Sequence, residues 1–141
     1  MTAKEYLLRL RKYKRQADNK IKEYNIIRAN LKFLQGLDYQ KDRVQVPVTD
    51  AIATAMAELV DAEVEAAYAI KVYTDKYNEG VNRINSLSRH EYVEILSIRY
   101  LEDDYEKRRL ESIACVMHYS YDRVRHMHGE ALQEFTEKYL R

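Results

Sequence analysis

The chain has 141 residues, enough for one domain or for two compact parts if one is an elongated hairpin, and its three Gly and single Pro are typical of a helical protein. The only cysteine, Cys115, excludes an intrachain disulfide framework and fits a reducing cytoplasm, and no run of about 18 apolar residues is present to span a membrane. Lys4, Glu5 and Arg9 interrupt any apolar signal segment, so we expect a cytoplasmic protein.

The net charge of +1 would by itself argue against a nucleic-acid-binding protein, but the charges are unevenly distributed. Residues 2–35 hold ten Lys and Arg against three Asp and Glu. Residues 36–87 hold five against nine, and residues 88–141 hold nine against eleven. The near-neutral total therefore conceals a strongly basic N-terminal segment.

Residues 2–35 are predicted to form one long helix. Thr2 and Glu5 have the spacing of a capping box, and Gly36 is a natural stop that opens a connector through Pro47. The expected inner positions follow at steps of three, four or seven. They are Tyr6, Leu10, Tyr13, Ala17, Tyr24, Ile27, Leu31 and Leu34.

A second long helix is predicted after the connector, capped by Thr49 or Asp50. Two amphipathic helices joined by a short connector should fold back antiparallel, because neither can bury its stripe alone. Residues 1–87 are therefore expected to form a coiled-coil-like helical hairpin for oligomerisation or partner docking. The inner positions of its second helix are expected to be Ile52, Met56, Leu59, Glu63, Ala66, Ile70, Tyr73, Tyr77, Val81, Ile84 and Leu87.

A third helix is predicted from Ser88, which has capping-box spacing to Glu91. Its apolar series is Tyr92, Val93, Ile95, Leu96, Ile98, Tyr100 and Leu101. Residues 102–109 are charged throughout, so we expect a solvated loop there.

Two short helices separated by a tight turn are predicted in residues 110–132. The first has an apolar stripe of period 3.6, and Ser120 can cap the second. The stripe comprises Leu110, Ile113, Ala114 and Met117, and the buried side of the second helix comprises Val124, Met127, Ala131 and Leu132. Basic and aromatic side chains would then face outward near the start of the second helix, as in a helix that reads the major groove.

Four segments resemble a known family: EILSIRY at residues 94–100, ESIA at 111–114, SYDRVRH at 120–126 and EAL at 130–132. They look like the promoter-reading helix-turn-helix of bacterial sigma factors, their fourth conserved region. A long helical N-terminal half ahead of such a domain is similar to the ArpU/RinA-like transcriptional regulators of Gram-positive phages and prophages. The resemblance implies a three-helix DNA-binding domain over residues 88–141, acting in a bacterial host cell to control an operon such as the late genes.

The resemblance carries over residue by residue only within the turn and the second helix. The candidate DNA-binding residues are Ser120, Tyr121, Asp122, Arg123, Arg125 and His126. The turn position that is usually Gly in the family is His118 here, which must adopt a left-handed backbone or shift the turn.

The basic residues of the first helix have two interpretations. Lys20, Lys22 and Arg28 are expected to lie beside the acidic start of the second helix, whose acidic residues are Glu58, Asp61, Glu63 and Glu65. The group at the opposite end comprises Arg9, Arg11, Lys12, Lys14 and Arg15. This group is either a solvated face or a patch that contacts DNA phosphates beside the reading helix.

Catalysis and metal binding are not predicted. The sequence has no Gly-rich phosphate loop and no nucleophile elbow, so we expect neither an enzyme nor a cofactor. Cys115, His118, His126 and His128 are metal-binding residue types, but His126 and His128 diverge by about 200° on a helix. We expect Cys115 to be a small residue packed at the edge of the domain.

The sequence therefore predicts an all-α transcriptional regulator that binds double-stranded DNA and forms a homodimer or docks on RNA polymerase. We expect no membrane partner. Two alternatives remain open. One is a phage small-terminase-like packaging subunit, which also combines a DNA-binding helical unit with oligomerising helices. The other is a helical adaptor that binds RNA polymerase without contacting DNA.

Overall fold

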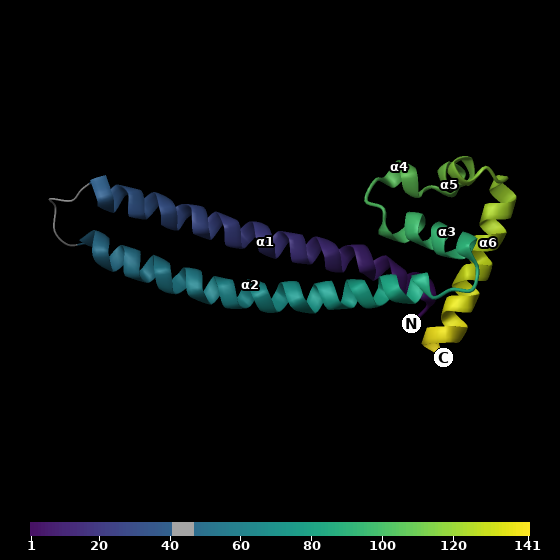
Figure 1. Ribbon diagram of the computed structural model, residues 1–141, viewed down its shortest axis with the longest axis horizontal. Helices are drawn as coiled ribbons and strands as arrows, with labels where there is room; N and C mark the ends of the chain where they lie inside the picture. Colours follow the sequence, from purple (N-terminus) through teal and green to yellow (C-terminus); the bar gives the residue numbers. More distant parts are fainter. Residues whose placement is uncertain (41–46) are drawn as a thin grey trace. The chain divides into compact units, whose positions relative to one another are not determined.

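The computed structural model describes residues 1–40 and 47–141, with the side chains of residues 1–30, 32 and 50–141. Every regular element in these ranges is helical, which confirms the all-α prediction. The elements are α1 (Ala3–Gln40), α2 (Pro47–Asn85), α3 (His90–Leu101), α4 (Tyr105–Arg108), α5 (Leu110–Met117) and α6 (Tyr121–Phe135), followed by the π-helical turn η1 (Thr136–Leu140) (Figure 1). None of the described helices is both long and apolar enough to cross a membrane.

The start of α1 has the predicted capping box. The Glu5 N–H donates to Oγ1 of Thr2 at 3.2 Å, and the Thr2 N–H donates to Oε2 of Glu5 at 3.1 Å. The predicted stop at Gly36 is wrong, because α1 continues to Gln40. A glycine inside a helix costs only about 1 kcal/mol relative to Ala, so it does not by itself end a helix.

α2 begins at Pro47, ahead of the predicted caps Thr49 and Asp50. Proline suits the first helical position because its missing N–H would have no partner there. The prediction of a cap at Thr49 or Asp50 is therefore wrong, and the middle of the predicted connector, residues 41–46, lies outside the described residues.

The chain divides into two compact units. The paired-helix unit is residues 15–73, and the core unit is residues 1–14 together with residues 74–141. In the paired-helix unit, α1 and α2 run antiparallel beside each other (Figure 1).

In the paired-helix unit, part of the inner face of α2 is shifted by one position along the helix from the predicted face. Ala66 is buried, whereas Met56 and Glu63, which were predicted to face inward, are exposed. The positions that alternate with Ile52, Leu59 and Ala66 are one residue earlier than predicted. They are the half-buried Ala55 and Ala62, whereas the predicted Ile70 is half-buried, next to Ala69. Small side chains on this face let α1 and α2 approach closely, and Met56, Val60 and Val64 lie outside it.

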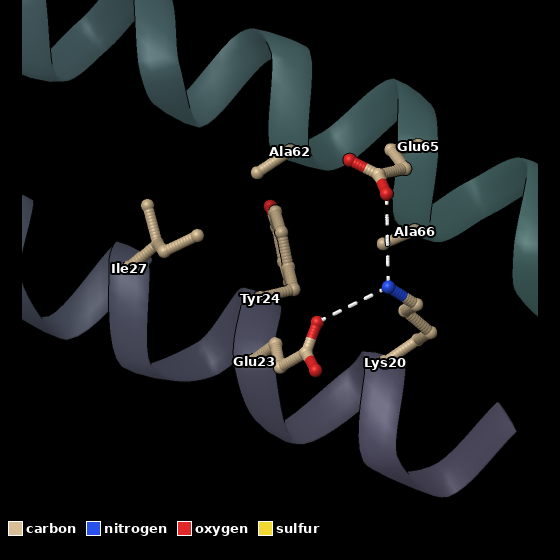
Figure 2. A pocket seen from close by; sticks show the side chains of 7 residues that line it. All are labelled: Lys20, Glu23, Tyr24, Ile27, Ala62, Glu65 and Ala66. Carbon is tan, nitrogen blue, oxygen red and sulfur yellow. Dashed lines mark hydrogen bonds and ion pairs between the residues drawn. The ribbon is translucent and has the colours of Figure 1, made fainter. Parts of the chain in front are cut away.

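One cation of α1 is neutralised within the paired-helix unit. Lys20 Nζ lies 3.3 Å from Oε2 of Glu23 and 3.6 Å from Oε1 of Glu65, as Figure 2 shows. The hydrogen bond that Lys20 donates to Glu23 is the main cause of the raised pKa of Lys20. These side chains, with Tyr24, Ile27, Ala62 and Ala66, line a cavity of about 70 Å³. The predicted pairing with the acidic start of α2 is thus confirmed for Lys20.

The core unit contains the main hydrophobic cluster. Its buried members are Ala3, Leu7, Leu10, Ile84, Leu87, Tyr92, Ile95, Leu96, Tyr100, Ile113, Ala114, Val124, Met127, Ala131 and Phe135. The Tyr6 ring of α1 lies 5.4 Å from the Phe135 ring of α6. A Cβ at Gly80 of α2 would lie 2.3 Å from Cδ2 of Leu10, so this close approach requires glycine. The first turns of α1 and the last turns of α2 therefore share one core with α3, α5 and α6.

Two local predictions for the core unit are wrong. Ser88 does not cap α3: the N-cap is Arg89, without a side-chain bond, and the Ser88 N–H donates to the Glu134 carboxylate of α6 at 3.1 Å. The expected solvated loop at residues 102–109 contains α4. Its N-cap, Asp104, accepts a hydrogen bond from the Glu106 N–H at 3.0 Å, which satisfies one of the free donors of a helix start.

Candidate nucleic-acid interface

The connection between α5 and α6 turns at His118, which has a left-handed backbone with φ 60° and ψ 37°. It is the only non-glycine residue with positive φ in residues 1–40 and 47–141. The Tyr119 N–H donates to the Ala114 carbonyl at 3.1 Å, which closes the end of α5. His118 was expected either to adopt a left-handed backbone or to shift the turn. It adopts the left-handed backbone, which is usually formed by Gly.

Ser120 caps α6 as predicted. Its backbone is extended, with φ −71° and ψ 155°, and its Oγ accepts a hydrogen bond from the Arg123 N–H at 3.2 Å. This bond satisfies one of the free N–H groups in the first turn. The left-handed residue and the cap together set the direction in which α6 leaves the turn.

The rear of α6 packs into the core unit. Val124, Met127 and Ala131 are buried as predicted, whereas Leu132 is only half-buried. Phe135 is fully buried and was missed, although it continues the same spacing of three and four residues. The inner stripe of α5 also matches its prediction, since Ile113 and Ala114 are buried and Leu110 and Met117 are half-buried.

Polar contacts fix α6 against α3. The Tyr92 hydroxyl donates to Oε2 of Glu130, and this bond is the main cause of the raised pKa of Tyr92. The Tyr100 hydroxyl lies 2.9 Å from Nε2 of His128. Burial, and then the positive charges of Arg99 and Lys4, lower the pKa of His128 from 6.5 to about 4. His128 is thus a neutral packing residue at pH 7.

The front of α6 is exposed over its first two turns. All five predicted outward side chains are accessible, namely Tyr121, Asp122, Arg123, Arg125 and His126. Nη2 of Arg125 lies 3.7 Å from Oδ1 of Asp122. This ion pair is largely exposed and so contributes little to stability, which leaves Arg125 free to exchange partners.

Tyr119 orients this surface and was not predicted from the sequence. The Arg123 guanidinium lies 4.5 Å from the centre of the Tyr119 ring, in the turn before α6. A cation over an aromatic face is attracted by about 0.5–1 kcal/mol at an exposed site. The only signal in the sequence was the spacing of four residues between Tyr119 and Arg123 across the cap.

The five residues of α1 that were interpreted as a solvated face or a phosphate patch have different surroundings. Arg9, Lys12 and Lys14 are exposed in the core unit, and Lys14 Nζ lies 5.9 Å from the Tyr77 ring. Arg15 belongs to the paired-helix unit. Arg11 is half-buried and joins a different group of cations, which is described below.

The metal-binding residue types are dispersed. Among the described residues, no group of three or more His, Cys, Asp or Glu is arranged to hold a metal ion. His128 faces Tyr100, while His118 and His126 are exposed. Cys115 is also exposed, so the prediction that it packs at the edge of the domain is wrong.

No family model, curated protein or solved structure matches this chain.

Proposed function

We propose that this chain is a non-enzymatic transcriptional regulator of phage or prophage type, which binds duplex DNA sequence-specifically through the front of α6 in the cytoplasm of a bacterial host. The observation that carries the proposal is the contrast between the two sides of α6. Five polar or aromatic side chains are exposed on its first two turns, whereas Val124, Met127, Ala131 and Phe135 are buried behind them. A helix that is held firmly from behind and is open at its N-terminal front suits major-groove readout.

The side chains at the front have the chemistry for reading bases. Arg123 or Arg125 can donate two hydrogen bonds to O6 and N7 of guanine, and Asp122 can accept one from a cytosine amino group. Tyr121 can contact a phosphate or a thymine methyl group. The left-handed His118 and the capping Ser120 support the likeness to the helix-turn-helix of sigma factors, whose fourth region reads promoters.

An exposed stripe on α2 supports a homodimer. Met56, Val60, Val64 and Tyr68 are 49%, 57%, 66% and 73% exposed. Residues four apart share one face of a helix, so these side chains form a continuous apolar surface opposite the alanine face. Contiguous exposed apolar surface is typical of protein contacts. A dimer would place two reading helices on half-sites separated by about 34 Å or multiples of it.

A second candidate function is that of an adaptor that binds RNA polymerase without contacting DNA. The observation that favours it is a cavity of about 380 Å³ beside α5. Val116, which is 63% exposed, lines this cavity together with Ile98 and Ser112, and the charged residues Glu102, Glu106 and Lys107 complete its lining. Apolar residues exposed beside a hollow are a feature of protein-binding surfaces.

Selection of bound sequences from a random duplex pool, at two salt concentrations, tests the proposal. Enrichment of one motif is expected, and a spaced inverted pair would also report the dimer. If nothing is enriched and all binding disappears at the higher salt, the contact is non-specific. In that case, retention of RNA polymerase by the purified protein would favour the adaptor.

A further inference from the structure

A small cavity in the core unit is surrounded by positive charge. Its volume is about 100 Å³. Lys4 and Arg11 reach it from α1, Arg99 from α3 and Arg108 from α4. The remaining lining residues are Leu8, Tyr100 and Tyr105, so none of the described residues around the cavity is acidic. The cavity is therefore an electropositive hollow whose cations come from three separate helices.

Two of these cations hold buried donors without acceptors. Nε of Arg11 and Nε of Arg108 are both inaccessible to solvent, and neither finds a hydrogen-bond acceptor among the described residues. Folded proteins leave very few buried polar groups unsatisfied, because each one lowers stability and a charged one lowers it more. Moreover, none of the four cations forms an ion pair with a described Asp or Glu. The positive charge around the cavity is therefore not balanced by any described carboxylate.

The cations are held in position by contacts that do not neutralise them. Nη1 of Arg99 donates to the main-chain carbonyl of Arg108 at 2.7 Å, which ties α3 to the end of α4. The Arg108 guanidinium lies 5.5 Å from the centre of the Tyr105 ring. The potential of the group also reaches α6, because Arg99 and Lys4 both lower the pKa of His128. Like charges held together in this way favour a ligand of high negative charge.

We propose that this cavity binds a single phosphoryl group, with Arg11 and Arg108 as its principal hydrogen-bond donors and Lys4 as a further charge. Guanidinium groups match the oxygens of a phosphate, and two of them can contact different oxygens of one tetrahedral anion. The group can come from the DNA backbone or from a free phosphate ester. The inference goes beyond the proposed function, because none of the exposed side chains at the front of α6 lines the cavity.

Titration of the full-length protein with inorganic phosphate, at constant ionic strength, tests the site. The arginine Nε–H resonances, assigned through single Arg→Gln variants, report directly on the two buried donors. Saturable shifts of the Arg11 and Arg108 signals are expected. Combining Arg11→Gln with Arg108→Gln should weaken phosphate binding by roughly tenfold or more, since each substitution removes a charged hydrogen-bond donor.

A matched control removes two charges from the same two helices outside the cavity. Combining Lys22→Gln with Lys107→Gln leaves the lining intact, and it should change phosphate affinity by about twofold or less, because exposed charges are screened. If circular dichroism shows that the Arg11 and Arg108 double variant is unfolded, Lys4→Gln replaces it. The Lys4 side chain is exposed, so this variant should fold and still bind phosphate several-fold more weakly.

A second arm distinguishes the source of the phosphoryl group. If a duplex shifts the two Nε–H signals and inorganic phosphate does not, the ligand is the DNA backbone. The double variant should then lose affinity for all duplexes alike, with a salt slope smaller by about 0.9 per lost contact. If neither probe moves the two signals, the phosphate site is refuted. Failure of the proposed DNA reading would appear separately, as absence of an enriched sequence while phosphate still binds.

Discussion

Tyr100 on α3 and His128 on α6 are joined by a hydrogen bond of 2.9 Å between the hydroxyl and Nε2, and their rings stack with centroids 5.8 Å apart. This pair connects the rear of the candidate reading helix to the cationic cavity, since Tyr100 also lines that cavity. Burial disfavours the protonated ring of His128, and the positive charges of Arg99 and Lys4 disfavour it further, so its pKa falls to about 4.

The depressed pKa of His128 predicts acid sensitivity. Between pH 6.5 and about 4, the unfolded chain protonates this histidine while the folded protein keeps it neutral. The unfolded state therefore binds more protons, and the free energy of unfolding should fall as the pH is lowered through this window. Urea unfolding at several pH values should show a shallower fall for His128→Gln than for wild type.

His126→Gln is the matched control for this experiment, because His126 lies on the same helix and is exposed. It should retain the pH dependence of wild type. Identical pH dependence in the His128→Gln variant and wild type would mean that His128 is not held neutral by the fold.

The cap of α6 predicts a local stability difference between two serines. Ser120→Ala should lower the free energy of unfolding by about 1 kcal/mol, because it removes the acceptor for the Arg123 N–H. Ser88→Ala is the control, since Ser88 contributes its main-chain N–H to Glu134 and its side chain does not cap α3. Chemical denaturation of both variants checks the prediction; a larger loss for Ser88→Ala would contradict it.

The left-handed backbone at His118 predicts that glycine is stabilising there. His118→Gly relieves a conformation that costs a residue with a Cβ about 1–2 kcal/mol, and part of this gain is offset by the greater freedom of the unfolded chain. We expect a net stabilisation of about 0.5–1 kcal/mol. His126→Gly, inside α6, should instead destabilise by about 1 kcal/mol. If His118→Gly is less stable than wild type, the contacts of the His118 side chain contribute more to stability than the strain of its backbone costs.

Features set by neighbouring residues could be predicted from the sequence, whereas features set by distant ones could not. The Ser120 cap and the buried side of α6 follow from spacing within a few residues, and both are present. The Ser88 cap has equally good local spacing. It fails because Glu134, 46 residues away, takes the Ser88 N–H.

The cationic cavity could not be predicted from the sequence either, because it depends on residues that are distant in the chain. Arg11 and Arg108 are almost a hundred residues apart, and only the packing of α1 against α3 and α4 brings them to one hollow. Periodicity placed Arg11 with its neighbours on α1, although its Nε is buried. The one-residue error on the inner face of α2 has another cause, since alanine carries too little hydrophobic signal to outweigh Met56 in a pattern.

The front of α6 predicts a base-specific loss of affinity. If Arg125 reads a base, Arg125→Gln should weaken binding to the best selected duplex by about 1–3 kcal/mol and relax specificity at one position. Arg89→Gln, an exposed arginine at the N-cap of α3, is the control for loss of one charge. Fluorescence anisotropy with matched and mismatched duplexes measures both. Equal affinity of Arg125→Gln and wild type for the best site would remove Arg125 from the reading surface.

The exposed stripe of α2 predicts the assembly state. Val60→Glu places a charge in the middle of the apolar surface formed by Met56, Val64 and Tyr68. Burying that charge at an interface would be costly, so the variant should have half the mass of wild type in light scattering. Thr54→Glu is the control, because Thr54 is exposed on the same helix away from the stripe and the variant should keep the wild-type mass. A wild-type mass equal to one chain would refute the dimer, and a ring-sized mass would favour a packaging subunit.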